Sequence, residues 1–196
     1  MRDGATTSTR DGTIDGIAAA GCIDPGDGDP FTSGVPCSSW GTMVAMQTAV
    51  TESQGALVAV PTPTVANARG GCTRSQAPLT DAGVFVEIGG ALSNGDTELS
   101  ATGFAITIAS SAMLVLSEAS STTMLPYDPV AMRWLRLRPA GGRIAYEYSP
   151  DGQHWTIARI STAPAPAVAD LAIDARTPTS NVLPGVAQFE GINVCP

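Results

Sequence analysis

Carboxylate side chains are the first candidates for chemistry in this sequence. Six glutamates are spread along the chain, and no two of them lie within ten residues of each other: Glu52, Glu87, Glu98, Glu118, Glu147 and Glu190. Hydrolysis of a glycosidic bond needs two carboxyl groups close together, one to protonate the leaving oxygen and one to attack or to activate water. The sequence offers no such pair along one strand, although carboxylates from different strands could still converge.

Catalysis by histidine or cysteine has little support. His154 is the single histidine and therefore the one candidate base for a hydrolytic triad. No G-x-S-x-G nucleophile elbow is present, and a cysteine nucleophile would also depend on His154. We therefore expect no catalytic residue, and we interpret His154 as a partly exposed residue beside a hairpin turn.

A short acidic segment could bind calcium. Asp24, Asp27 and Asp29 alternate with proline and glycine, and carboxylates at such spacing can surround a hard cation with oxygen ligands. An EF-hand loop would end in a bidentate glutamate, and none follows here. A calcium site at these three aspartates is therefore one interpretation, and a solvated Asp/Gly linker is the other.

The four cysteines indicate the compartment. None forms a C-x-x-C pair, and His154 is remote in sequence, so a zinc site lacks closely paired ligands. An even number of cysteines in a Gly/Pro-rich chain favours two disulfides and an oxidising compartment. Of the three possible connectivities we favour Cys37–Cys72, which closes a local loop, and Cys22–Cys195, which ties the entry of the domain to its last strand. Four reduced, buried thiols are the alternative.

Composition excludes several classes of partner. The 196 residues contain ten arginines, no lysine and 18 acidic residues, which gives a net charge of −8. Nucleic acid needs a basic surface, and no apolar run approaches the roughly 18 residues that would insert into a membrane. Residues 1–16 are polar and show no signal peptide, yet the disulfides lead us to expect an extracellular or cell-surface protein.

The elements that must position these residues are short strands. Apolar segments rich in Val and Ile, five to nine residues long, alternate with turn residues, which is typical of an all-β sandwich or barrel. The expected strands lie in these ranges: 42–50, 56–60, 83–88, 104–109, 113–118, 132–138, 143–149, 154–160, 168–174 and 186–194. Residues 1–30 are rich in Asp, Gly and Thr and predict an irregular N-terminal arm or linker.

The stretch 132–161 carries two turn signals, Gly141-Gly142 and Asp151-Gly152. Each can supply the positive φ that a two-residue hairpin requires. With both turns in place, one face of the resulting sheet is apolar and is predicted to be buried: Leu135, Leu137, Tyr146, Tyr148, Trp155 and Ile157.

The opposite face of these hairpins could bind a sugar. Trp134 could stack on the C–H face of the ring, while Arg136 and Glu147 could hydrogen-bond its hydroxyl groups. The alternative is a cross-strand Arg136–Glu147 pair with the tryptophan packed under a loop.

The segment W-L-R-L-R…Y-E-Y-S-P-D-G-Q-H-W resembles the late hairpins of concanavalin A-like lectin/glucanase domains, particularly the laminin-G-like modules of bacterial secreted proteins. The closing A-Q-F-E-G-I-N-V is similar to their last strand, and P-C-S-S-W-G to an early one. The resemblance covers residues 31–195 and implies a jelly roll, that is, an antiparallel β-sandwich of two sheets. We therefore expect a 1–30 arm and a 31–196 sandwich domain.

Catalytic members of that superfamily carry E-x-D-x-x-E on one strand, and this chain lacks the pattern. The resemblance therefore implies a non-catalytic module that binds carbohydrate or extracellular matrix. The alternative is a structural or adhesive module that docks to a protein partner, or forms a homo-oligomer through its N-terminal arm and strand edges.

Overall fold

A computed structural model describes residues 13–14, 17–18, 21–119, 121–180 and 183–196. These residues contain no helix, and therefore none that could cross a membrane. The strands are β1 (Thr13–Ile14), β2 (Ile17–Ala18), β3 (Thr42–Met46), β4 (Thr48–Ser53), β5 (Ala56–Pro61), β6 (Ala68–Pro78), β7 (Val84–Gly90), β8 (Asp96–Ala101), β9 (Phe104–Ala109), β10 (Met113–Glu118), β11 (Ser121–Pro126), β12 (Trp134–Ala140), β13 (Arg143–Ser149), β14 (Thr156–Pro164), β15 (Val168–Thr177) and β16 (Ala187–Ile192).

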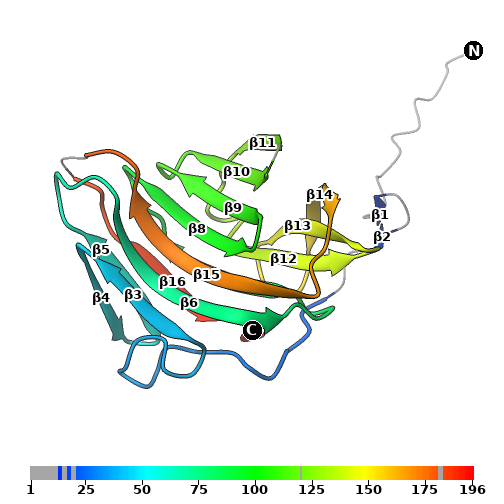
Figure 1. The fold of residues 1–196 in the computed structure, drawn as a ribbon, viewed down its shortest axis with the longest axis horizontal. Coiled ribbons are helices and arrows are strands. Elements are labelled where there is room, and N and C mark those ends of the chain that lie inside the picture. Colours follow the sequence, from blue (N-terminus) through cyan, green and yellow to red (C-terminus); the bar gives the residue numbers. More distant parts are fainter. Residues whose placement is uncertain (1–12, 15–16, 19–20, 120, 181–182) are drawn as a thin grey trace, which may run out of the picture.

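Two antiparallel sheets of seven strands each form the sandwich, which confirms the all-β fold class. The first sheet has the order β11-β10-β9-β8-β15-β6-β3, and the second has the order β14-β13-β12-β7-β16-β5-β4. In Figure 1 the curved strands β6, β15 and β8 lie side by side, with β16 of the second sheet behind them. The chain changes sheet repeatedly, so both sheets contain strands from distant parts of the sequence.

The core lies between the sheets and follows from the alternation of side chains along each strand. On β15, for example, Leu171, Ile173 and Ala175 are buried in the core cluster. Phe189 of β16 and Leu135 of β12 are fully buried in the same cluster. Burying these side chains is the main favourable term for the fold.

Part of the segment before residue 31 is described by the structure. Strands β1 and β2 pair with each other as a small hairpin, and residues 1–12, 15–16 and 19–20 lie outside the described residues. Cys22 is bonded to Cys195, and Asp29 forms a β-bridge with Ile192. The second half of the expected arm therefore runs along the sandwich beside its last strand.

Both expected disulfides are present, Cys22–Cys195 and Cys37–Cys72. They close loops whose ends are 173 and 35 residues apart in sequence. In the chain-entropy description these closures stabilise the fold by roughly 5 and roughly 4 kcal/mol, as upper limits. They support an oxidising compartment for this protein.

The expected strands differ from the observed ones in instructive places. The range 42–50 is divided at Gln47, whose positive φ of 50° turns the chain from β3 in the first sheet to β4 in the second. Strands β6, β8 and β11 were not expected, because polar or small residues dominate them. β6 contains Gly70-Gly71 in its first half, and a Cβ at Gly71 would collide with the backbone oxygen of Ile173. Glycine there allows β6 and β15 to pair closely.

The first predicted hairpin is confirmed and the second is wrong in register. Arg136 lies opposite Glu147, as the Gly141-Gly142 turn requires. A two-residue turn at Asp151-Gly152 would place Tyr148 opposite Trp155, whereas Tyr148 pairs with Thr156.

The cause is a wider loop, held by side chains of the turn itself. The carboxylate Oδ1 of Asp151 accepts hydrogen bonds from the backbone N–H groups of Gln153 (2.9 Å) and His154 (2.8 Å), and Ser149 Oγ accepts one from Gly152 (3.0 Å). Trp155 is buried as expected, but it packs with Phe85 and Trp134 outside the main core.

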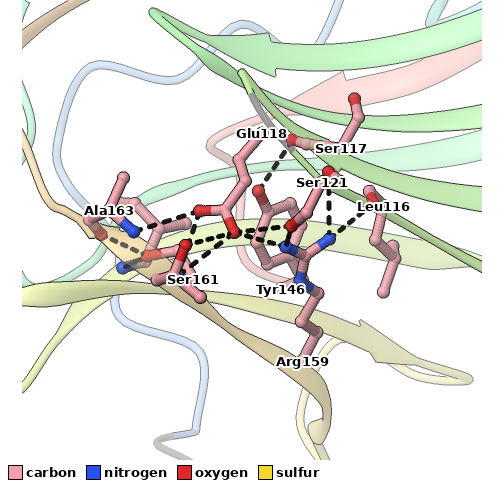
Figure 2. A network of polar contacts seen from close by, with 10 residues as sticks. Leu116, Ser117, Glu118, Ser121, Tyr146, Arg159, Ser161 and Ala163 are labelled. Atoms are coloured by element: carbon pink, nitrogen blue, oxygen red, sulfur yellow. Dashed lines mark hydrogen bonds and ion pairs between the residues drawn. The ribbon is translucent and has the colours of Figure 1, made fainter.

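A network around Glu118 joins the edges of the two sheets (Figure 2). Glu118, on β10, accepts hydrogen bonds from Ser121 Oγ (2.9 Å), the Thr162 backbone N–H (3.0 Å) and the Ala163 N–H (3.1 Å). It also forms an ion pair with Arg159 of β14. Burial alone would raise the pKa of Glu118, but these hydrogen bonds outweigh it and lower the pKa to about 2.

The arginine completes the network from the other side. Arg159 lies over the ring of Tyr146, with the guanidinium carbon 5.4 Å from the ring centroid, and donates to the carbonyl of Leu116 at 2.9 Å. The Tyr146 hydroxyl donates to the carbonyl of Ser117 at 2.7 Å. Side chains of the second sheet thus bind the backbone of β10 in the first sheet.

We predict that Glu118→Gln destabilises the protein by about 3 kcal/mol, because it leaves the largely buried Arg159 without its carboxylate. The folded pKa lies below the ordinary 4.5, so the stabilisation by Glu118 is complete above pH 4.5 and is lost as the pH falls toward about 2. Urea unfolding at several pH values measures both effects. Asp81→Asn, at an exposed carboxylate, is the control; an equal loss in both variants would contradict the prediction.

Candidate functional site

The residues expected to form a sugar platform are not at the surface. Trp134, Arg136 and Glu147 are 4%, 0% and 1% exposed. Arg136 Nε lies 2.5 Å from Glu147 Oε2, and Arg138 donates to Glu147 Oε1 at 2.9 Å. The expected sugar platform is therefore wrong, and the alternative holds: Arg136 and Glu147 form a buried cross-strand ion pair, and Trp134 is packed beside it.

The N-terminal segment covers this face of the second sheet. The carbonyl of Gly21 accepts a hydrogen bond from Arg136 at 3.0 Å, and the Cys22–Cys195 disulfide packs against the cluster of Phe85, Trp134 and Trp155. The guanidinium of Arg136 stacks 3.9 Å from the centroid of Trp155. Burial lowers the pKa of Arg136, and the charge of Glu147 opposes this shift. The arrangement buries all three side chains of the expected sugar platform, so none of them is available to a ligand.

The three aspartates of the expected calcium loop do not converge. Asp24 accepts a hydrogen bond from Gly26 N–H at 2.7 Å, and Asp27 forms an ion pair with Arg74. Asp29 is fully buried, where it accepts hydrogen bonds from the backbone of Phe31 and Ser39. In the described ranges, no group of three or more acidic, histidine or cysteine side chains is arranged to hold a metal ion.

His154 lies at the surface. Its side chain is 85% exposed, and its Nδ1 atom is 2.7 Å from the carboxylate of Asp151. Hydrogen bonds from the His154 backbone and ring lower the pKa of Asp151. Asp151 and His154 therefore stabilise the loop between β13 and β14.

Charged side chains gather instead on the outer face of the first sheet. Residues 174 and 176 of β15 point away from the core because their neighbours Ile173 and Ala175 point into it. The register places Asp174 opposite Glu98 of β8, and Arg176 opposite Asp96 of β8 and Arg69 of β6. We call these five side chains the charged row: Arg69, Asp96, Glu98, Asp174 and Arg176.

Ion pairs fix the geometry of the charged row. Arg69 donates to Asp174 Oδ2 through Nε (3.1 Å) and Nη2 (2.7 Å), and Arg176 pairs with Glu98. Glu98 also accepts a hydrogen bond from Thr107 Oγ1 at 2.8 Å. Four of the five side chains are therefore held by an ion-pair partner on a neighbouring strand.

Burial shifts the protonation of the charged row. Asp174 is 1% exposed, and burial raises its pKa although Arg69 opposes the shift. Burial likewise raises the pKa of Asp96 and lowers that of Arg176. Asp174 Oδ1 and Arg176 Nε are 3.7 Å apart, and neither makes a hydrogen bond to the described residues. Perturbed groups of this kind concentrate at functional sites.

Two hollows adjoin the charged row. One has a volume of about 500 Å³ and we call it the hydroxyl hollow; its lining includes Glu98, Ser100, Thr102, Phe104, Ser117 and Asp170. The other has a volume of about 250 Å³ and we call it the arginine hollow; it is lined by Asn67, Arg69, Asp96, Arg176, Thr177 and Pro178. Because Glu98 and Arg176 are ion-paired, the charged row connects the two hollows.

Sequence reasoning missed the charged row because its members come from three strands, two of which were not expected. A signal was present on β15, where Leu171, Ile173 and Ala175 alternate with polar positions that include Asp174 and Arg176. That alternation places the two charges on the outer face. The pairing partner that brings Glu98 beside them could not be inferred.

Comparison with known proteins adds little. No protein-family model matches the chain, and no curated protein matches it. A solved structure described as a sialidase is 9% identical with a TM-score of 0.46, and the match covers 76% of this chain but only 16% of the sialidase chain. A functionally unknown protein from Saccharomyces cerevisiae is 17% identical with a TM-score of 0.48, over 78% of this chain and 91% of that one.

We predict that Trp155→Ala costs about 3–5 kcal/mol of unfolding free energy, because it removes a ring packed between Phe85 and Arg136. Urea unfolding measures the loss. His154→Ala, at the exposed neighbouring position, should stay within about 0.5 kcal/mol of the unchanged protein. All three tryptophans are buried, so strong quenching of the tryptophan fluorescence by an aqueous quencher in the folded protein would contradict this placement.

Proposed function

We propose that this protein is a non-catalytic, extracellular β-sandwich module that binds carbohydrate on the outer face of its first sheet. The observation that carries the proposal is the charged row between two hollows, with carboxylates and guanidinium groups of fixed orientation. The two disulfides support the extracellular location.

The chemistry of the face suits sugar hydroxyl groups. A hydroxyl both donates and accepts hydrogen bonds, so adjacent hydroxyls can bind a carboxylate and a guanidinium together. Glu98 and Arg176 present such a pair, and Ser100 and Ser117 add hydroxyl groups in the hydroxyl hollow. Partners fixed in advance lose little side-chain entropy when a ligand binds.

Binding on this face should be weak. The hollows are shallow, and a sugar exchanges hydrogen bonds with water for hydrogen bonds with protein, which gains about 1 kcal/mol for each contact. We therefore expect a Kd in the micromolar to millimolar range, with avidity raising the apparent affinity by ~10²-fold or more when several copies act together.

The geometry also favours binding over hydrolysis. Asp174 is 1% exposed and accepts two hydrogen bonds from Arg69, so it is poorly placed to reach a glycosidic oxygen. Glu98 is 7% exposed and is held by Arg176 and Thr107. Proton transfer by either carboxylate would first require its ion pair with arginine to break.

A structural or adhesive module is the second candidate. Strand β3 has a single neighbour in the first sheet and carries exposed Met43 and Met46, while β11 at the other edge carries exposed Met124. Unpaired strand edges can add a strand from another chain. Assembly through the N-terminal arm belongs to the same candidate.

The test is a glycan array probed with a multivalent form of the protein, followed by calorimetry on the glycans that bind. Glu98→Gln and Ser100→Ala should each weaken binding, by about tenfold for Glu98→Gln, which corresponds to 1.4 kcal/mol. Asp81→Asn makes the same change in net charge as Glu98→Gln at an exposed position and should leave the Kd unchanged.

Three results would count against the proposal. If the protein hydrolyses a polysaccharide and Glu98→Gln abolishes this activity, the protein is an enzyme and not a binding module. If both variants bind the glycan as tightly as the unchanged protein, the binding site lies elsewhere on the molecule. A stable homo-oligomer in light scattering, together with no glycan binding, would favour the structural candidate.

A further inference from the structure

A separate pocket lies where loops close one end of the sandwich. It has a volume of about 320 Å³, within the size range of sites for small molecules. We call it the rim pocket; its lining includes Gly89, Gly90, Tyr127, Pro129, Arg133 and Glu190. None of these residues belongs to the charged row or to either hollow.

An irregularity in β16 directs Glu190 toward this pocket. Phe189 pairs with Ile88 and Gly191 pairs with Glu87, so Glu190 is an extra residue that has no partner on β7. Such bulges re-aim a side chain and are frequent beside binding sites. A Cβ at position 89 would lie 2.5 Å from Glu190 Oε1, so the glycine leaves space for the carboxylate.

Charge at the rim pocket is unbalanced. Arg133 Nε lies 2.6 Å from Glu87 Oε1, and Arg133 Nη2 lies 2.7 Å from Glu190 Oε2. One guanidinium therefore serves two carboxylates, which leaves one negative charge in excess. Burial raises the pKa of Glu87; Arg133 opposes the shift, and the neighbouring Glu190 adds to it. A positively charged ligand would neutralise this excess negative charge.

The other wall is uncharged and partly aromatic. Tyr127 and Pro129 line it, and burial with the nearby Asp128 raises the pKa of Tyr127 to about 12. The phenol therefore stays neutral at physiological pH. Carboxylates on one side and an aromatic residue on the other are the surroundings that attract an organic cation.

We propose that the rim pocket binds a primary ammonium group carried by a small ring, for which a free amino sugar is a suitable probe. The ammonium pairs with Glu190 at the open side of the Arg133 ion pair, and the body of the ring packs against Tyr127 and Pro129. The site is independent of carbohydrate binding on the charged row.

Calorimetric titration of the full chain with glucosamine, glucose and N-acetylglucosamine tests the proposal. The titrations are run at about pH 6, where an amine with a pKa near 8 is protonated. We expect glucosamine to bind about tenfold or more tightly than the two neutral sugars. Glu190→Gln should remove this preference, and Asp81→Asn should retain it.

A second variant guards against loss of folding in Glu190→Gln. Ala91→Phe fills the pocket from its wall and should also abolish glucosamine binding, without removing a charge. Equal affinity for the three sugars would overturn the proposal, as would glucosamine binding that survives both variants. Calcium binding that depends on Glu190, without glucosamine binding, would assign the pocket to a metal ion instead. The two proposals can fail separately. Glucosamine binding without any glycan binding on the array would support the rim pocket alone, and the opposite result would support the charged row alone.

Discussion

The alternation of side chains along antiparallel strands is the constraint on which the rest of the structure depends. On β15 it directs Ile173 and Ala175 into the core and Asp174 and Arg176 out of it. A slip of one residue would place two charges between the sheets, at a cost of several kcal/mol for each ion. The register that builds the core therefore also builds the charged row.

The same constraint explains how much of the fold could be predicted. Alternating apolar residues and Gly141-Gly142 were enough to define the first hairpin, including Arg136 opposite Glu147. The second hairpin failed because Ser149 and Asp151 hold a wider loop through side-chain hydrogen bonds, which a two-residue turn signal does not reveal. Strand β6 could not be predicted because most of its residues are glycine or polar and show no apolar alternation. Its strand conformation depends instead on backbone pairing with β15.

The sites were harder to predict than the fold. Cysteine spacing predicted the Cys22–Cys195 disulfide, but not that the bridge would pack over Trp134 and close the face that Arg136 occupies. Local sequence shows which side of a strand is polar; it does not show whether another segment covers that side. Glu98 and Glu190 meet their arginine partners only through pairing or bulging of strands from distant parts of the chain.

The Cys22–Cys195 disulfide also determines how the protein bears tension. The bond joins residues 173 positions apart, at the beginning and end of the sandwich. A pulling force that enters the chain before Cys22 and leaves it after Cys195 passes through a single covalent bridge, and the sheets between them carry no load. A module linked in this way would remain folded under extension. The chain between the two cysteines could then not be pulled out, so the module would contribute almost none of its contour length to the extension.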